Sequence, residues 1–343
     1  MSNIYAKSIS NNEIQSINYT TSIQFYGDSI TTGAGVTTVQ RWTNRLASTI
    51  GSTEINQGVS GMEWTDCNQK YLNVAPTRGQ TTFIALGTND AQRNQVRFDH
   101  TIHAQKAAIA FLALPTNNFI DVRSSSAVTK AGTWTNTGAF IYGLRTTDMT
   151  GGSTLTFTIT GNILMISNTI LSGWNSSQYI NMQVIVNGSV LTNWPLIHSL
   201  NQSQNGYAYP SFLFLYDFGS SATRTIVLKP SQQGSTPSGN AAEFYVDWVA
   251  GYDSNTVTGG SQVIVPEFGY IDITKLGTIP SVANMEALKI MQKRACRELG
   301  KTGLNVFYLE RANGIPYGMM LDGLHPNSDG HAKIARDTLQ LTI

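Results

Sequence analysis

Charged side chains are scarce in this chain. Only 13% of its 343 residues are Asp, Glu, Lys or Arg, against ~25% in an average soluble protein. The 22 basic and 21 acidic residues leave a formal net charge of +1, and they form no basic run. This balance would attract neither nucleic acid nor an anionic membrane, so we expect neither as a partner.

Cysteine is almost absent. The two cysteines, Cys67 and Cys296, are expected to be buried thiols, because isolated cysteines usually behave as small core residues. A disulfide between them stays open, although a chain of this length folds without one. Two cysteines cannot build the usual zinc site, and we predict neither a metal nor a cofactor.

Long hydrophobic runs are also missing. No stretch of ~18 apolar residues occurs, which excludes a membrane-spanning helix and membrane insertion. The N-terminal residues MSNIYAKSISNNEIQ lack the basic patch and apolar run of a secretory signal. Ser, Thr, Asn, Gln and Gly take the place of charged residues, as is typical of secreted and virion proteins that handle sugars. We therefore expect an extracellular or virion (phage tail) location, reached by another export route.

The first third of the chain alternates between strand and helix patterns. The expected strands are Ser22–Gly27, Thr53–Gly58 and Thr81–Gly87, and the expected helices are Arg41–Ile50, Glu63–Asn73 and Asp99–Leu114. Strands that alternate with helices predict a parallel sheet covered on both faces. The pattern returns after Gly260, with strands at Gln262–Pro266 and Asn305–Leu309 and helices at Ser281–Gly300 and Asn327–Leu339.

The middle of the chain has a different pattern. Alternating runs without a helical period occur at Leu155–Thr160, Ile180–Val186, Phe212–Tyr216, Thr225–Leu228 and Glu243–Val249, separated by turn signals such as Asn187-Gly188 and Gly219–Ala222. These runs predict an antiparallel β-sandwich. The fold class is therefore α/β, with a discontinuous α/β domain (1–115 and 260–343) and an inserted sandwich (116–259).

Four polar clusters lie in predicted loops. They are Gly27-Asp28-Ser29, Ser60-Gly61, Asn89-Asp90 and Asp322-Gly323-Leu324-His325. The first three follow strands that should be parallel and adjacent, so all three should open on one edge of the sheet, where open α/β sheets place their sites.

In type, order and placement, these clusters resemble the sequence blocks of the SGNH (GDSL-like) hydrolase superfamily. The resemblance covers the α/β part and not the insert. It implies a flavodoxin-like three-layer α/β/α fold and an activity among esterases, lipases, thioesterases and carbohydrate O-acetylesterases.

The residues fit acyl transfer. Ser29 is the expected nucleophile, His325 can accept its proton, and Asp322, three residues earlier, can hold the other ring nitrogen. The resemblance implies that the oxyanion donors are the backbone N–H groups of Ser29 and Gly61 and the side-chain amide of Asn89. The absence of a Cβ at Gly61 should let substrate approach its N–H group.

Simpler interpretations exist for individual residues. Asn89-Asp90 could be a turn, and Asp322 and His325 could cap a helix or, with weak support, bind a metal. Asp28 and Asp90 are expected to fix loops by hydrogen bonds. The other histidines are expected to be a solvated face (His100, His103), a structural residue (His331) and an unassigned insert residue (His198).

The insert is rich in aromatic residues suited to sugar rings. They are Trp134, Trp174, Trp194, Trp248, Tyr207 and Tyr209, of which Trp248 is expected in the core. The segment Glu243–Tyr252 resembles the closing strand of carbohydrate-binding jelly rolls. We therefore predict O-deacetylation of a polysaccharide or oligosaccharide, with an acetylated glycan as partner. The alternatives are a lipase or thioesterase and a non-enzymatic glycan-binding adhesin. A homo-oligomer and a virion component both stay open.

Overall fold

The computed structural model describes eleven stretches of the chain. They are residues 4–6, 15–67, 77–92, 98–137, 143–148, 150–171, 179–197, 211–233, 243–267, 282–310 and 314–341. The chain divides into two compact units: unit 1 is Met1–Cys67, Pro76–Pro115 and Thr258–Ile343, and unit 2 is Asn68–Ala75 and Thr116–Val257.

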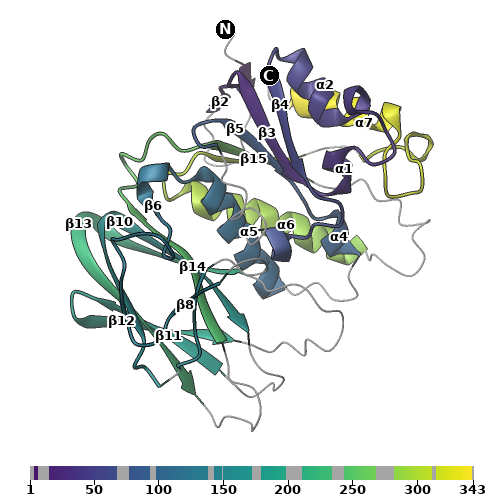
Figure 1. Ribbon diagram of the computed structural model, residues 1–343. Coiled ribbons are helices and arrows are strands. Elements are labelled where there is room, and N and C mark those ends of the chain that lie inside the picture. The colour runs from purple at the N-terminus through teal and green to yellow at the C-terminus, as the bar shows by residue number, and fades with distance from the viewer. Residues whose placement is uncertain are drawn as a thin grey trace. The chain divides into compact units, whose positions relative to one another are not determined.

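A five-stranded parallel sheet forms the centre of unit 1 (Figure 1). Its strands are β3 (Ser22–Gly27), β4 (Thr53–Gly58), β5 (Thr81–Ala85), β15 (Gln262–Pro266) and β16 (Val306–Leu309). The spatial order is β16-β15-β5-β3-β4. Numbered along the chain, this is the order 2-1-3-4-5 of flavodoxin-like folds, which confirms the predicted fold class.

Helices cover both faces of this sheet. They are α1 (Ser29–Thr32), α2 (Trp42–Thr49), α4 (Thr88–Ala91), α5 (Phe98–Ala113), α6 (Val282–Gly300) and α7 (Ser328–Gln340), with short 3₁₀ turns η1 (Thr38–Gln40) and η3 (Tyr317–Met319). Helix α2 packs against α7 on one face, and α5 packs against α6 on the other (Figure 1). Unit 1 also contains the antiparallel pair β1 (Ile4–Ala6) and β2 (Gln15–Ile17).

Aromatic side chains fix the contact between the sheet and the α2–α7 layer. Phe25 of β3 stacks on Phe83 of β5 with ring centroids 5.3 Å apart. The ring of Trp42, the first residue of α2, meets Phe25 edge-on at 5.3 Å. All three side chains are buried. The strands that precede the polar clusters are therefore held rigidly against one helical layer.

Unit 2 is built from antiparallel strands. They are β6 (Phe119–Ile120), β7 (Thr129–Ala131), β8 (Thr135–Thr137), β9 (Gly143–Thr146), β10 (Thr154–Leu171), β11 (Tyr179–Val186), β12 (Ser189–Ile197), β13 (Ser211–Gln233) and β14 (Glu243–Tyr252), after the 3₁₀ turn η2 (Thr116–Asn118). The predicted Asn187-Gly188 turn joins β11 to β12, and both residues have positive φ (50° and 83°), as a tight hairpin requires.

One expectation for unit 2 needs correction. The predicted turn at Gly219–Ala222 is not a strand break, because one long strand, β13, includes both flanking runs. Residues 218–221 instead bulge opposite Asn162, between the pairs Gly161↔Ala222 and Ile163↔Asp217. The described strands of unit 2 form one nine-stranded antiparallel sheet, in which β6 and β7 pair off the main path. The division of these strands into the two layers of a sandwich stays a prediction.

Some expectations fall partly or wholly outside the described residues. Residues 64–67 are helical, as predicted, but the rest of the predicted helix to Asn73 lies outside them. Ser281, the first residue of a predicted helix, also lies outside, as do Trp174, His198, Tyr207 and Tyr209. Across the described helices, none combines the length and apolar character needed to cross a membrane.

Candidate active site

Ser29 lies directly beyond the carboxyl end of β3, at the start of α1. The Asp28 side chain caps this short helix by accepting the backbone N–H of Ile30 at 2.9 Å. A Cβ on Gly27 would come within 2.6 Å of the Ala85 carbonyl oxygen, so only glycine fits this tight exit from the strand. The nucleophile candidate is therefore placed by a turn whose sequence allows little variation.

His325 bridges Ser29 and Asp322. Its Nε2 lies 3.0 Å from Ser29 Oγ across 296 residues of sequence, and its Nδ1 lies 2.8 Å from Asp322 Oδ2. The other carboxylate oxygen of Asp322 accepts the backbone N–H groups of Leu324 (2.9 Å) and His325 (2.7 Å). This local turn orients the carboxylate toward the ring.

The charge of Asp322 sets the tautomer of His325. Partial burial opposes ionisation of Asp322, but the hydrogen bonds from His325 and from the backbone outweigh burial and lower its pKa to about 2. An ionised carboxylate only accepts hydrogen bonds, so His325 must donate from Nδ1. Its Nε2 is then free of hydrogen and can accept the hydroxyl proton of Ser29.

The two remaining motif loops begin level with Ser29. Gly27 lies opposite Gly58 of β4 and Ala85 of β5 in the parallel ladders. The order of strands reverses between β3 and β5, which is the switch point where open α/β sheets form their crevices. Gly61 follows β4 and Asn89 follows β5 at this same edge.

The backbone conformation of Gly61 gives a further reason for glycine at this position. A Cβ there would meet no protein atom within 4 Å, so packing within the protein does not select glycine, and the expected approach of substrate stays a prediction. Its φ of +76° does select glycine, because side-chain-bearing residues rarely adopt that conformation. Asn89 donates one amide hydrogen to the Met62 carbonyl oxygen at 3.0 Å, which fixes the orientation of its side chain and links its loop to that of Gly61.

Two buried carboxyl groups support these loops, as expected. Asp28 caps α1 and has a pKa raised to about 6. Burial raises this pKa, and hydrogen bonds from Ile30 and Thr88 lower it in part. Asp90 accepts the backbone N–H of Trp64 at 3.2 Å. Burial, and next the charge of Glu63, raises the pKa of Asp90 well above its usual range.

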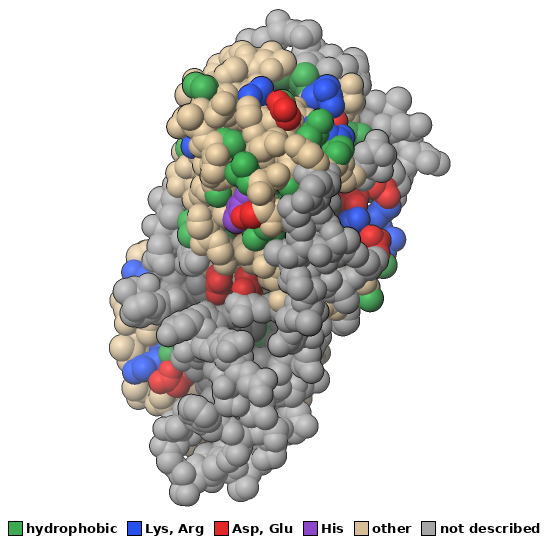
Figure 2. Space-filling view, turned by 90° about the vertical axis from the view of Figure 1, so that its right-hand side faces the viewer, with side chains coloured by type: hydrophobic (Ala, Val, Ile, Leu, Met, Phe, Trp, Pro, Cys, Tyr) green, Lys and Arg blue, Asp and Glu red, His purple; other side chains and the backbone are tan. Residues whose placement is uncertain are grey.

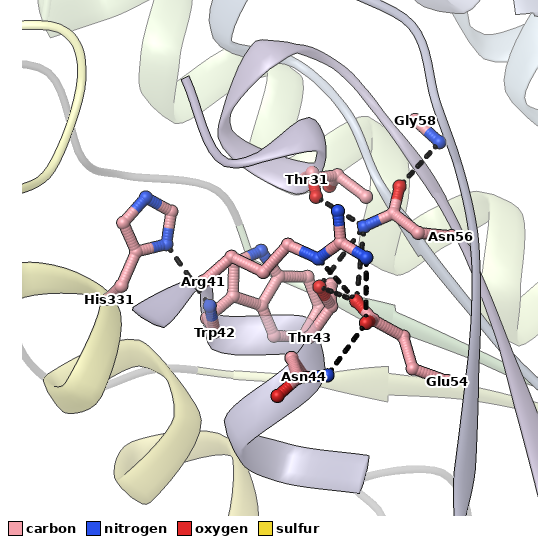
Figure 3. Close-up of polar contacts among 9 residues, drawn as sticks. All are labelled: Thr31, Arg41, Trp42, Thr43, Asn44, Glu54, Asn56, Gly58 and His331. Carbon is pink, nitrogen blue, oxygen red and sulfur yellow. Dashed lines mark hydrogen bonds and ion pairs between the residues drawn. The ribbon is translucent and has the colours of Figure 1, made fainter. Parts of the chain in front are cut away.

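Among the remaining histidines, His331 has a contact that explains its position. His331 is buried in α7, and its Nδ1 accepts the backbone N–H of Trp42 at 3.2 Å, which confirms its structural role (Figure 3). Burial, then the charges of Arg45 and His325, lowers the pKa of His331 to about 4. His103 is half-buried rather than fully solvated, and the His100 side chain is outside the described part of the chain.

Cys67 and Cys296 are buried and form no disulfide, as predicted. Burial raises the pKa of Cys296, so this thiol is not poised to react. Among the described residues, no three or more His, Cys, Asp or Glu side chains gather in a way that could hold a metal ion.

A polar network that was not predicted from the sequence lies on β4 and the neighbouring helices. Glu54 and Asn56 lie on β4 and face the first residues of α2 and the end of α1 (Figure 3). The available signal was their spacing, because two polar residues at alternate positions of a strand share one face. Their hydrogen-bond partners lie up to 25 residues away in sequence, so the spacing alone could not identify them.

Comparison with known proteins gives one family match and several distant structural similarities. Residues 25–136 match the GDSL-like Lipase/Acylhydrolase family, a match that includes Ser29, Gly61 and Asn89. This part of the chain is thus similar in sequence to GDSL-like lipases and acylhydrolases. No curated protein matches the chain.

Several solved structures are distantly similar. A carbohydrate acetylesterase from Sinorhizobium meliloti has 11% identity and a TM-score of 0.39, with 94% of this chain and 97% of that chain covered. A catalytic mutant of an acetylxylan esterase from Geobacillus stearothermophilus has 10% identity and a TM-score of 0.40, with 95% of each chain covered. A G-D-S-L family lipolytic protein from Veillonella parvula DSM 2008 has 11% identity and a TM-score of 0.39, with 93% and 96% covered.

Proposed function

We propose that this protein is a serine esterase in which Ser29, His325 and Asp322 form the catalytic triad. Two consecutive hydrogen bonds carry the proposal: Ser29 Oγ to His325 Nε2 at 3.0 Å, and His325 Nδ1 to Asp322 Oδ2 at 2.8 Å. Such contacts allow the imidazole to take the hydroxyl proton as the oxygen attacks an ester carbonyl. Asp322, ionised at all but strongly acidic pH, would stabilise the imidazolium that forms.

The remaining steps follow from the same groups. His325 would return its proton to the leaving alcohol, leaving an acyl group on Ser29, and a water molecule would then attack that acyl-enzyme with His325 again as base. The backbone N–H groups of Ser29 and Gly61 and the Asn89 amide would stabilise the tetrahedral oxyanion. An amide has two N–H donors, so the bond from Asn89 to Met62 leaves the second hydrogen for the oxyanion.

For the substrate, we propose an O-acetyl group on a polysaccharide or oligosaccharide. Three features support this choice: the low charge of the chain, its polar composition, and an inserted β unit with aromatic side chains. Flat aromatic faces cover the C–H side of a sugar ring well. We also propose that unit 2 is a carbohydrate-binding domain, and that the protein acts outside the cell or on a virion.

A lipase or thioesterase is the second candidate, because two exposed aliphatic side chains lie within the site loops. Val59 is 40% exposed and lies two residues before Gly61, and Leu321 is 51% exposed and precedes Asp322. Figure 2 shows an exposed histidine beside an acidic side chain, with hydrophobic side chains scattered around the pair. An apolar surround of this kind could hold a longer acyl chain.

A panel of esters separates the candidates. For a glycan deacetylase, we expect kcat/KM for acetate release from an acetylated polysaccharide to exceed that for p-nitrophenyl acetate, and long-chain p-nitrophenyl esters to be poor substrates. Replacing residues 116–257 by a short Gly/Ser linker should reduce the polysaccharide reaction far more than the small-ester reaction. A preference for long acyl chains would favour the second candidate, and glycan binding without any hydrolysis would indicate an adhesin.

A further inference from the structure

Asn56 lies where the helix that carries Ser29 meets the loop that carries Gly61. Its amide nitrogen donates to the Thr31 carbonyl oxygen of α1 at 2.7 Å, and its amide oxygen accepts the backbone N–H of Gly58 at 2.9 Å (Figure 3). One side chain thus contacts the backbone two residues after Ser29 and the backbone three residues before Gly61.

Helix α1 depends on such an external contact. It has four residues, and the last carbonyl groups of a helix find no partner within the helix itself. A helix this short is also unstable alone, because its nucleus costs more than its few hydrogen bonds return. The bond from Asn56 satisfies the Thr31 carbonyl and holds the end of α1 against β4.

The Gly58 end of the contact is equally constrained. Strand β4 is at the edge of the parallel sheet, so its outward N–H groups need partners from outside the ladder. A Cβ on Gly58 would lie 2.9 Å from the Thr32 backbone nitrogen, which shows how closely α1 packs on this residue. Beyond Gly58 the chain leaves the sheet toward Gly61. The contact therefore fixes the position of α1 relative to the start of the loop that leads to Gly61.

Glu54 holds the Asn56 amide in its orientation. Its carboxylate accepts two bonds of 2.7 Å from the Arg41 guanidinium and one of 3.0 Å from Asn44. It also accepts the Thr43 hydroxyl and, at 3.3 Å, the Asn56 amide nitrogen. Burial opposes ionisation of Glu54, but these bonds outweigh it and lower its pKa. The Glu54 carboxylate lies beside the NH₂ group of Asn56, and the Gly58 N–H lies beside its oxygen. The Asn56 amide therefore has one favourable orientation.

We propose that Asn56 is a positioning residue for ester hydrolysis: it sets Ser29 at the correct distance from the oxyanion donors by tying α1 to the Gly61 loop. The proposal rests on the proposed function of Ser29. Displacement of a nucleophile by ~1 Å can cost a factor of about 10² in rate without loss of substrate binding.

The test compares Asn56→Ala with Asn44→Ala. Both variants remove one amide donor to Glu54, but only Asn56 also contacts α1 and Gly58. With p-nitrophenyl acetate, Asn56→Ala should lower kcat about 10–100-fold with KM within about twofold, and Asn44→Ala should leave kcat within about twofold. Asn56→Asp keeps the acceptor for Gly58 but loses the donor to Thr31, so its kcat should fall similarly. It also supplies the comparison if the alanine variant does not fold.

Hydrogen exchange gives a readout that is independent of turnover. The amides of Gly58 and Gly33 should exchange faster in Asn56→Ala than in Asn44→Ala, because α1 and the start of the loop lose their tie. Equal exchange at these amides, equal kcat in the two variants, or a loss confined to KM would overturn the positioning role. Ser29→Ala separates this result from the proposed function: wild-type turnover in that variant would reject the triad itself.

Discussion

The parallel sheet of unit 1 gathers its polar side chains in loops beyond the strand ends, whereas the antiparallel sheet of unit 2 carries its aromatic side chains along the strands. In unit 1, Ser29, Asn89 and His325 come from separate parts of the chain and reach one sheet edge in short helices or turns. In unit 2, Phe214, Tyr216 and Phe218 alternate along β13 and contact one another in sequence.

This difference follows from how each sheet is built. Parallel strands all end at the same edge, so the segments that follow them lie close together there. Antiparallel strands send alternate loops to opposite edges, and their shared surface is the face of the sheet. We therefore expect unit 1 to perform the reaction and unit 2 to provide a binding face. Substitutions at matched residues of the two units test this division of roles.

The first prediction concerns two buried serines, each hydrogen-bonded in its own unit. Ser29→Ala should reduce kcat/KM for p-nitrophenyl acetate by roughly 10⁴-fold or more, because only oxyanion and binding effects remain. Ser167 of unit 2 donates to Asp247 at 2.8 Å, and Ser167→Ala should leave turnover of the same ester unchanged. A fluorophosphonate probe should label Ser29 alone, as read by peptide mass spectrometry. Turnover above a few per cent in Ser29→Ala would contradict the assignment.

The second prediction compares two asparagines. Asn89→Ala should lower kcat by roughly 10²–10³-fold with little change in KM, because the amide acts mainly on the oxyanion of the transition state. Asn162 of unit 2 donates to Asp217 (2.9 Å) and Ser254 (3.0 Å), so Asn162→Ala should lower Tm and leave kcat unchanged. Steady-state kinetics and thermal melts measure both. A pure KM effect at Asn89 would make it a substrate-binding residue instead.

The parts that could be predicted from sequence are those set by local pattern. Strands β3, β4 and β15 have the predicted bounds, because each is a short apolar or alternating run that ends in a turn signal. The motif loops follow from those strands. Asp28, Asp90 and His331 also have the supporting roles expected of them.

The missed features depend on contacts between distant residues. The bond from Asn56 to Thr31 could not be predicted, because it requires knowing that α1 packs on β4. Strand β12 contains Thr192, Asn193 and Pro195, which obscure alternation, and only pairing with β11 reveals it. The sequence also left open which insert tryptophans are exposed: Trp248 is buried, as predicted, and Trp134 and Trp194 are partly buried against the unit 2 core.

The third prediction concerns two aspartates with opposite pKa shifts. Burial raises the pKa of Asp28 from 3.8 to about 6, so between these values the folded state binds more protons than the unfolded state. Stability must then fall as pH rises through this window, by up to about 3 kcal/mol. Asp28→Asn lacks this penalty and keeps an oxygen for the Ile30 N–H, so its unfolding free energy relative to wild type should rise from pH 3.5 to pH 7.

Asp148 of unit 2 is the matched control for this titration. Hydrogen bonds from Thr150, followed by the bond from Ser153, lower the pKa of Asp148, so its carboxylate stabilises the folded state at neutral pH and that stability is lost in acid. Asp148→Asn should therefore lose stability relative to wild type as pH rises, opposite in sign to Asp28→Asn. Urea unfolding at pH 3.5, 5 and 7 measures both differences. The same sign in both variants would contradict the two assignments.

The smallest expected effect concerns Tyr216, the most exposed ring of the row on β13. It is 37% exposed, stacks parallel to Phe214 at 6.4 Å and meets Phe218 edge-on at 4.9 Å, while the Arg224 guanidinium covers the Phe218 ring at 4.1 Å. Phe214 belongs to the unit 2 core, so the row runs from the core to the surface and Tyr216 can be shortened without opening a cavity. One aromatic contact typically contributes about 0.5–1.5 kcal/mol beyond its buried area.

If the row binds glycan, Tyr216→Ala should raise KM for acetylated polysaccharide roughly 3–10-fold and leave p-nitrophenyl acetate hydrolysis unchanged. Val190, exposed on β12 of the same unit, supplies the control variant Val190→Ala, which should change neither reaction. Equal behaviour of the two variants on polysaccharide would remove this row from the binding face, and with it the described aromatic support for a glycan role of unit 2.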